Sequence, residues 1–232
     1  MKNKKLEQKE AKQRHKKQLK TKRRPEPSLC RPSAILTEYP SILIVCEGRN
    51  TEPSYFNQFR LSSATVKSVG EGYNTKSLVN RAIKLSKEKN YDQVWCVFDK
   101  DDFDENDFNT AIQLAQQNGF EIAYSNQAFE YWLIIHFDDH QGGGMHRNSY
   151  NKKINELLKP FNVTYDGEGT KLVTEDIFEL LDGIDNKTHK KRVDLAIVRA
   201  KRNYDKFDHK SPAKEESSTT VFRLVEELLK YL

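Results

Sequence analysis

The chain has 232 residues, of which 39 are Lys or Arg and 34 are Asp or Glu, so its formal net charge is +5. No apolar run approaches the ~20 residues that a membrane-spanning helix requires, and the N-terminal stretch lacks the apolar segment of a secretory signal. Three cysteines without paired spacing indicate a reducing compartment. We therefore expect a cytoplasmic protein without membrane contact, long enough for one α/β domain with an appendage.

The positive charge is concentrated at the start of the chain. Residues 1–24 carry 12 Lys or Arg and two Glu, a net charge of +10, and the rest of the chain therefore carries −5. Pro25, Pro27 and Pro32 mark a linker, so we expect residues 1–33 to be a basic, disordered tail without a core of its own. Such a tail is either an arm that binds nucleic acid or a solvated, frayed helix that only improves solubility.

Strand patterns and helix patterns alternate over residues 40–140. Short runs rich in β-branched and apolar residues predict strands over 41–46, 64–69, 91–98 and 120–124. Apolar residues at helical spacing predict helices that begin near Thr51 and extend over 78–85, 108–115 and 129–137. This alternation favours an α/β fold with a four-stranded parallel sheet and helices on its faces.

The pattern changes after residue 140. Residues 149–232 have apolar residues at helical spacing throughout, so we predict a helical C-terminal region that packs on the α/β core. The Ser/Thr run over residues 217–220 precedes the last helix, and Ser218 or Thr219 is its expected N-cap.

Acidic residues stand where two of the predicted strands end. The run 41–46 leads into Glu47, and the run 91–98 leads into Asp99 and Asp101. Because the carboxyl ends of parallel strands share one edge of a sheet, we expect these side chains to meet there. Carboxylates brought together repel each other unless protons or a cation neutralise them, and oxygen ligands suit Mg²⁺ or Mn²⁺. Turn chemistry explains an Asp-x-Asp pair alone, but the two clusters together favour a metal site.

A carboxylate site of this kind fits phosphodiester cleavage, in which a divalent ion stabilises charge on the attacking and leaving oxygens. A carboxylate near the ion that is not fully used as a ligand can also move a proton. Glu130 lies in a very apolar helix, where a carboxylate is costly without a partner, so it is either a further metal ligand or a buried cap or salt bridge. His136 is either a donor to the scissile phosphate or a satisfied core histidine.

Other candidate residues give weaker signals. His136, His140 and His146 do not make a zinc motif, because no Glu follows His136 and glycines interrupt any helix. Lys76 lies in the turn 70–77, which could hold a substrate phosphate but has Thr75 where a nucleotide-binding loop requires its second glycine.

Two arginines are candidates for contacts with nucleic-acid phosphates. Arg192 and Arg199 are seven residues apart and share a flank of the predicted helix 190–204, away from its apolar stripe. A solvated helix face is the simpler explanation of the same pattern.

The segment Ile44–Phe56 resembles the opening of RloB-like proteins. The likeness continues through residues 69–72, 91–102, 125–137 and 218–225 and so spans roughly residues 40–232. The resemblance implies a Toprim-type fold, in which Glu47 acts as general acid or base while Asp99 and Asp101 hold Mg²⁺. It also implies a toxic nuclease of a bacterial anti-phage defence system with an ATPase partner. Several similar proteins attack tRNA.

Three functions stay open at this level. The favoured one is a nuclease that uses Mg²⁺ or Mn²⁺ and cleaves RNA, preferably tRNA, or DNA. The second is a non-catalytic subunit that binds nucleic acid or a partner protein. The third is a phosphotransferase or phosphatase with Asp99 as nucleophile, which Lys100 between the acids and the missing downstream Thr disfavour. The pattern does not determine the natural substrate or the oligomeric state.

Overall fold

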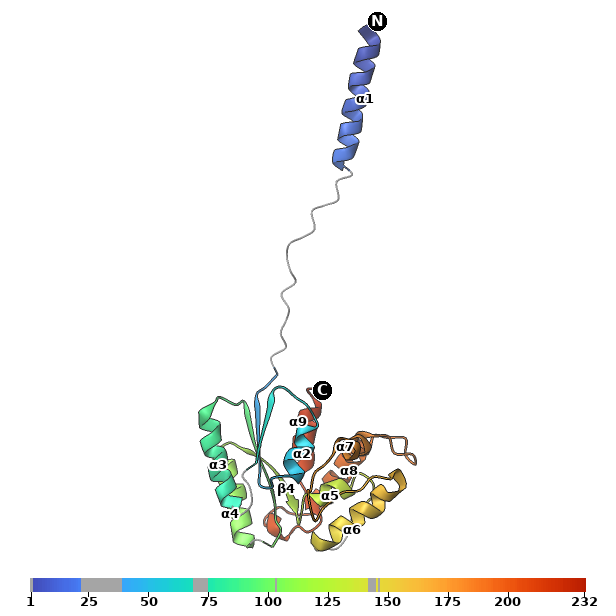
Figure 1. Ribbon diagram of the computed structural model, residues 1–232. Helices are drawn as coiled ribbons and strands as arrows, with labels where there is room; N and C mark the ends of the chain where they lie inside the picture. Colours follow the sequence, from blue (N-terminus) through green and yellow to red (C-terminus); the bar gives the residue numbers. More distant parts are fainter. Residues whose placement is uncertain (1, 22–38, 69–74, 103, 142–144, 146) are drawn as a thin grey trace. The chain divides into compact units, whose positions relative to one another are not determined.

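The computed structural model describes residues 2–21, 39–68, 75–102, 104–141, 145 and 147–232, and the chain divides into two compact units, Met1–Glu38 and Tyr39–Leu232. In the first unit, Lys2–Thr21 form helix α1, where we expected a disordered tail (Figure 1). Lys, Gln, Glu and Ala favour helices and make up most of this segment, which contains no Gly or Pro. Residues 7–17 are all exposed, so this segment is a solvated helix, and its contact with nucleic acid stays a prediction. The predicted linker lies outside the described residues.

The second unit is built on a mixed sheet of five strands, mostly parallel, with the order β2-β1-β3-β4-β5 (Figure 1). The parallel strands are β1 (Ile42–Cys46), β2 (Ala64–Ser68), β3 (Gln93–Asp99) and β4 (Glu121–Asn126). Strand β5 (Ser218–Thr219) pairs antiparallel with the end of β4. The prediction of four parallel strands is confirmed for these four, but it missed β5, because two residues are too few to show an alternating pattern.

Successive side chains of the central strands enter two different cores. On one face, Leu43 and Cys96 pack with α3 (Thr75–Glu88) and α4 (Glu105–Gln117). On the other face, Ile44 and Val97 pack with α2 (Thr51–Asn57) and with the C-terminal helices. Because helices cover both faces, the central strands are buried on both sides, which explains their nearly continuous apolar sequence.

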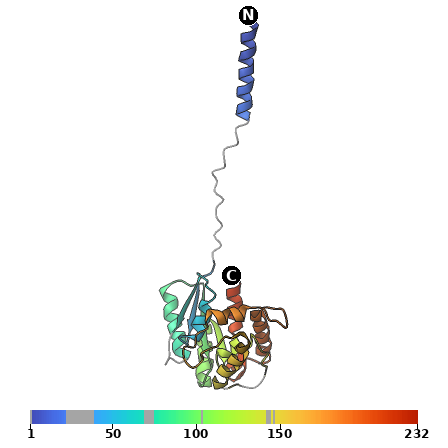
Figure 2. The same cartoon turned by 45° about the vertical axis from the view of Figure 1, so that its right-hand side comes forward.

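The C-terminal helices lie together on the α2 side of the sheet, opposite α3 and α4 (Figure 1, Figure 2). They are α6 (Arg147–Leu158), α7 (Glu175–Asp182), α8 (Arg192–Tyr204) and α9 (Val221–Leu229), with the short 3-10 helix η1 (Lys159–Phe161). A second 3-10 helix, η2 (Pro212–Lys214), packs against α4 on the other face. The predicted helix over 129–137 is shorter, since α5 spans only Glu130–Ile134. The expected core and the helical extension therefore belong to one compact unit.

The beginning of α9 differs slightly from the expected cap. Thr220 is the N-cap residue and makes no capping hydrogen bond with its side chain, whereas Thr219 Oγ1 accepts a hydrogen bond from the N–H of Val221 at 3.2 Å. Among the helices of the described ranges, none has the length and apolar character needed to cross a membrane.

Candidate functional site

Glu47 and Asp99 meet at the carboxyl edge of the sheet. Strands β1 and β3 are parallel neighbours, and Glu47 extends β1 by one residue, because its N–H donates to the carbonyl oxygen of Val97 at 2.9 Å. Glu47 Oε2 in turn accepts a hydrogen bond from the backbone N–H of Asp99 at 3.4 Å, across 52 residues of sequence. This is the juxtaposition that the two strand patterns predict.

Asp99 is almost buried, and only one of its carboxyl oxygens has a hydrogen-bond partner. The residue is 8% exposed, and its Oδ2 accepts a hydrogen bond from the N–H of Phe129 at 3.0 Å. Its Oδ1 is buried and finds no partner among the residues that the structure describes. Burial raises the pKa of Asp99 well above its usual range, and the negative charges of Glu52, Asp101 and Glu130 raise it further. The position therefore favours a proton or a cation beside Oδ1.

Asp101 lies in a turn whose backbone is fixed against the end of β4. Its φ of 42° is in the left-handed region, which Asp tolerates better than most residues. Its N–H donates to the carbonyl oxygen of Gln127 at 2.9 Å, and the N–H of Lys100 donates to that of Ser125 at 2.9 Å. These two hydrogen bonds fix the backbone of Lys100 and Asp101 against the end of β4.

Glu52 is a further carboxylate of this cluster that sequence reasoning missed. Glu52 lies in the first turn of α2, shortly after Gly48, and is only 5% exposed. Its Oε1 accepts a hydrogen bond from the N–H of Gly48 at 3.3 Å. A Cβ atom at position 48 would lie 2.3 Å from Glu52 Oε2, so any other residue there would have to displace the end of the Glu52 side chain. Burial raises the pKa of Glu52 to about 7, and the charges of Glu130 and Asp101 contribute to the increase. The sequence signal that could have identified Glu52 is its position four residues after Gly48.

Glu130 also belongs to the cluster and is held by the C-terminal region. It is the first residue of α5 and 8% exposed, and its Oε1 accepts a hydrogen bond from the hydroxyl of Tyr165 at 2.9 Å. The same hydroxyl lies 3.1 Å from Thr51 Oγ1. The partner is thus a neutral hydroxyl, and not the basic side chain that the salt-bridge alternative requires.

The chemistry of these donors fits a hard divalent cation. All five carboxylates offer only oxygen ligands, and the buried Oδ1 of Asp99 is an atom that a cation would satisfy. The five are Glu47, Glu52, Asp99, Asp101 and Glu130. Their present arrangement is not a complete coordination shell, since no group of three or more His, Cys, Asp or Glu side chains in the described ranges is placed to hold an ion.

His136 follows the end of α5 and is buried. It is 1% exposed, and its Nδ1 lies 2.8 Å from the carbonyl oxygen of Trp132. Burial lowers the pKa of His136 to about 3, so the imidazole is neutral. It lines a cavity of about 300 Å³ together with apolar side chains such as Tyr55, Phe178 and Leu229. His136 is therefore a core histidine, but its Nε2 is buried without a hydrogen-bond partner in the described ranges, so it is not the satisfied one that we considered. Its predicted role as a donor to a phosphate stays a prediction.

Arg192 is a packing residue, and the prediction that it lies away from the apolar stripe is wrong. It is 5% exposed, and its guanidinium lies over the rings of Phe137 at 5.3 Å and Phe161 at 5.0 Å. It also donates to the carbonyl oxygen of Leu180 at 2.9 Å, near the end of α7. Aromatic residues distant in sequence make this position apolar, which helical spacing alone does not reveal.

The other two basic candidates have partners within the chain. Arg199 Nη1 donates to the carbonyl oxygens of Ile135 at 2.7 Å and His136 at 3.1 Å, beyond the end of α5. Lys76 forms an ion pair of 2.6 Å with Asp107 of α4. Both side chains are partly exposed, so their predicted contacts with phosphates stay predictions.

Two of the weaker sequence signals fall outside the described residues. These are the turn that precedes Thr75 and the histidine at position 146. His140 is described, and its carbonyl oxygen accepts hydrogen bonds from the hydroxyl of Tyr131 at 3.1 Å and the side chain of Asn203 at 3.0 Å.

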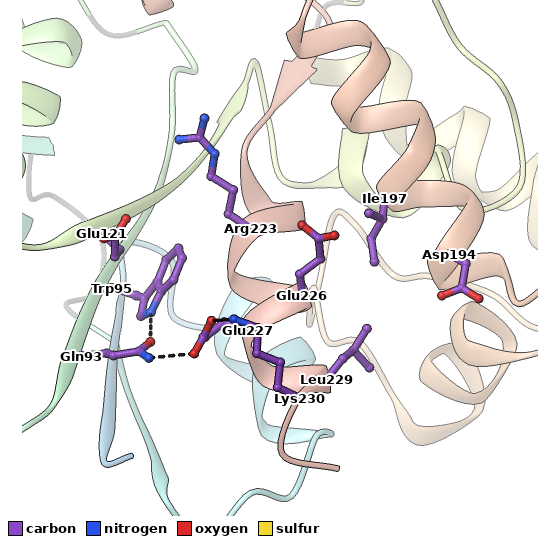
Figure 3. Close-up of a pocket in the computed structure, with 10 residues that line it drawn as sticks. All are labelled: Gln93, Trp95, Glu121, Asp194, Ile197, Arg223, Glu226, Glu227, Leu229 and Lys230. Carbon is purple, nitrogen blue, oxygen red and sulfur yellow. Dashed lines mark hydrogen bonds and ion pairs between the residues drawn. The ribbon is translucent and has the colours of Figure 1, made fainter. Parts of the chain in front are cut away.

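A cavity of about 830 Å³ lies at the amino ends of β3 and β4, between these strands and helices α8 and α9 (Figure 3). Its lining residues are Gln93, Trp95, Glu121, Asp194, Ile197, Arg223, Glu226, Glu227, Leu229 and Lys230. Because the five carboxylates gather at the carboxyl ends of the strands, this cavity is not part of the candidate site.

Comparison with known proteins identifies the family. The family model described as "RloB-like protein" matches residues 42–228, a span that includes the five carboxylates and Tyr165. No curated protein and no solved structure matches the chain. Since the family model covers most of its length, the chain belongs to the RloB-like family.

Proposed function

We propose that this protein is a divalent-metal-dependent nuclease with a Toprim-type site. The observation that carries the proposal is the meeting of Glu47 and Asp99 at the carboxyl edge, with Oδ1 of Asp99 buried and without a partner in the described ranges. Membership of the RloB-like family supports it, because a Toprim fold is what the resemblance implies.

Glu47, Asp99 and Asp101 would hold Mg²⁺ or Mn²⁺, and Glu130 would support a second ion. When bound, such an ion stabilises negative charge on the attacking and leaving oxygens of a phosphodiester. The chain orients its ligands through backbone groups: the N–H of Phe129 holds Asp99 Oδ2, and the N–H of Asp99 holds Glu47 Oε2.

Proton transfer has two candidates in this cluster. Glu47 is the residue that the family resemblance assigns as general acid or base. Glu52 has a pKa of about 7, which is the range in which a side chain both accepts and releases a proton at neutral pH. Its contact with the Gly48 N–H keeps it beside the end of β1.

The proposed substrate is RNA, with tRNA favoured, or DNA. The proposed context is a toxic effector of anti-phage defence in the bacterial cytoplasm, with an ATPase partner. The net charge of +10 in residues 1–24 supports contact with a polyanion, since basic segments bind phosphate backbones without sequence specificity.

The phosphotransferase alternative is disfavoured by the sequence around Asp99. Lys100 lies between the two acids, and the downstream Thr is missing. A non-catalytic binding subunit is the remaining alternative, and the same experiment separates it from the nuclease.

The test combines Mn²⁺ binding with cleavage. The full chain is titrated with Mn²⁺ in a calorimeter and incubated with tRNA, single-stranded DNA and plasmid in Mg²⁺, Mn²⁺ or EDTA, with and without the ATPase partner. Asp99→Asn and Glu47→Gln are the site variants, and Asp102→Asn in the same turn, where Asp102 is exposed, is the matched control. We expect cleavage in Mg²⁺ or Mn²⁺ that EDTA and both site variants remove while the control retains it. Cleavage that survives both site variants refutes the proposed site, and Mn²⁺ binding without cleavage under all conditions favours the binding subunit.

A further inference from the structure

We infer that Tyr165 is a positioning residue of the candidate site, whose hydroxyl holds Glu130 within the carboxylate cluster. This inference rests on the proposed function and adds to it a residue from outside the predicted α/β core. It makes the C-terminal region a part of the site.

The hydroxyl of Tyr165 links two elements that carry site residues. Tyr165 is 1% exposed, and its hydroxyl donates to Glu130 Oε1 of α5 at 2.9 Å. A tyrosine hydroxyl has one proton, so the contact of 3.1 Å with Thr51 is one in which Thr51 Oγ1 donates to the tyrosine oxygen. The resulting chain of hydrogen bonds leads from α2, beside Glu52, to the carboxylate of Glu130.

The backbone of Tyr165 is itself held from both sides by one side chain. The N–H of Tyr165 donates to Asn155 Oδ1 at 2.8 Å, and Asn155 Nδ2 donates to the carbonyl oxygen of Tyr165 at 2.9 Å. Asn155 belongs to α6, which packs against α5. The tyrosine is therefore fixed relative to the helix that carries Glu130.

The segment that follows Tyr165 is tied to α2. Ser54 Oγ accepts a hydrogen bond from the N–H of Val173 at 2.8 Å, and Gln58 Nε2 donates to the carbonyl oxygen of Val173 at 3.3 Å. The chain between η1 and α7 thus contacts both α2 and α5. These attachments to two elements that carry site residues are consistent with a positioning role for Tyr165.

A neutral donor suits a carboxylate that must stay available to a cation. Glu130 is buried near Asp99 and Glu52, whose pKa values its charge raises. A Lys or Arg partner would neutralise Glu130 and compete with the ion, whereas a hydroxyl satisfies one oxygen and leaves the charge in place.

The test measures how the loss of one hydroxyl changes metal binding. In Tyr165→Phe the ring stays and the donor to Glu130 is lost. We expect Mn²⁺ binding to the full chain, measured by calorimetry, to weaken about tenfold, which is typical of losing a partner that orients a ligand. The Mn²⁺ concentration for half-maximal cleavage should rise by a similar factor. Tyr124→Phe is the matched control, because Tyr124 is also buried and donates to a buried glutamate, Glu215, at 3.4 Å, but on the α4 face.

The outcomes separate this inference from the proposed function. If the wild type and Tyr165→Phe bind Mn²⁺ equally well, the positioning role is refuted and the proposed nuclease stands. If the wild type neither binds Mn²⁺ nor cleaves, the proposed function is refuted, and so is this inference, which rests on it. Should Tyr165→Phe not fold, Glu130→Gln decides, because Tyr165 acts on the metal only through the Glu130 carboxylate. Unchanged Mn²⁺ binding in Glu130→Gln would then refute the positioning role.

Discussion

Acidic side chains at the two ends of the parallel strands differ in their hydrogen-bond partners and in the direction of their pKa shifts. At the amino ends, Glu227 accepts a hydrogen bond from Gln93 at 2.7 Å and pairs with Lys230 (Figure 3). It also accepts a hydrogen bond from the hydroxyl of Tyr231 at 2.7 Å. Partial burial would raise its pKa, but these three donors lower it to about 2. At the carboxyl ends, burial raises the pKa of Glu52 to about 7, and Asp99 keeps an unpartnered oxygen within the described ranges.

This contrast separates a structural acid from a candidate site. A carboxylate that the fold uses for stability is surrounded by donors, as Glu227 is. A cluster of buried carboxylates destabilises the metal-free fold, and such clusters are typical of sites where a ligand supplies the missing partner. Each of the following predictions tests one side of the comparison.

The largest expected effect is on catalysis. Asp99→Asn should lower the rate of phosphodiester cleavage about 1,000-fold, since the loss of a metal ligand removes several kcal/mol of transition-state stabilisation. Glu227→Gln, which changes an acid at the other edge, should leave the rate unchanged. Initial rates at saturating Mn²⁺ measure both. Equal losses in the two variants would remove the distinction between the edges.

The next effect is on the pH dependence of stability. The pKa of Glu52 in the folded state, about 7, lies above its ordinary value of 4.5, so the folded state binds this proton more tightly than the unfolded state. The contribution of Glu52 to stability is therefore present at low pH and lost as pH rises from 4.5 to 7, by about 3 kcal/mol. Urea unfolding in EDTA should show that Glu52→Gln gains stability relative to the wild type over this window. A difference that does not change with pH would contradict the assigned environment.

A smaller effect is expected from closing the space beside Gly48. A Cβ in Gly48→Ala would lie 2.3 Å from Glu52 Oε2, so the carboxylate must move, at a cost of about 2 kcal/mol. Truncation of the same carboxylate in Gly48→Ala with Glu52→Ala should relieve most of this cost. A double-mutant cycle from thermal unfolding measures the coupling. Additive effects of the two substitutions would show that Glu52 does not lie against Gly48.

The smallest effect concerns the paired acid itself. Glu227→Gln should destabilise the fold by about 1 kcal/mol, because the pair is partly exposed and solvent weakens it. The low pKa of Glu227 means that its contribution is present above its ordinary value of 4.5 and is lost as pH falls toward 2. Urea unfolding at pH 7 and pH 3 measures the change, which should be smaller at pH 3. A stabilised variant at pH 7 would contradict the assignment.

The parts of the site that follow from periodicity were predictable. Apolar runs identified the four parallel strands, and parallel strands bring Glu47 and Asp99 to one edge. The place of Glu52 in the carboxylate cluster was not predicted, because the chain reverses between β1 and α2 and helical spacing does not reveal such a reversal. The contact of Tyr165 with Glu130 was not predicted, because Tyr165 lies outside the helices and strands and reaches Glu130 only through tertiary packing. The prediction for Arg192 was wrong for the same reason, since Phe137 and Phe161 cover it from other parts of the chain.

The sheet has one closed border and one open border. Strand β5 pairs with the end of β4, α8 contacts β5 and α9 contacts β4, whereas β2 is the outermost strand on the other side. The last two residues of β2, Lys67 and Ser68, are exposed. A lysine on an edge strand opposes the addition of a foreign strand, because pairing would have to desolvate its charge. Lys67 therefore opposes aggregation through strand addition at β2, and Lys67→Val is the change that would promote it.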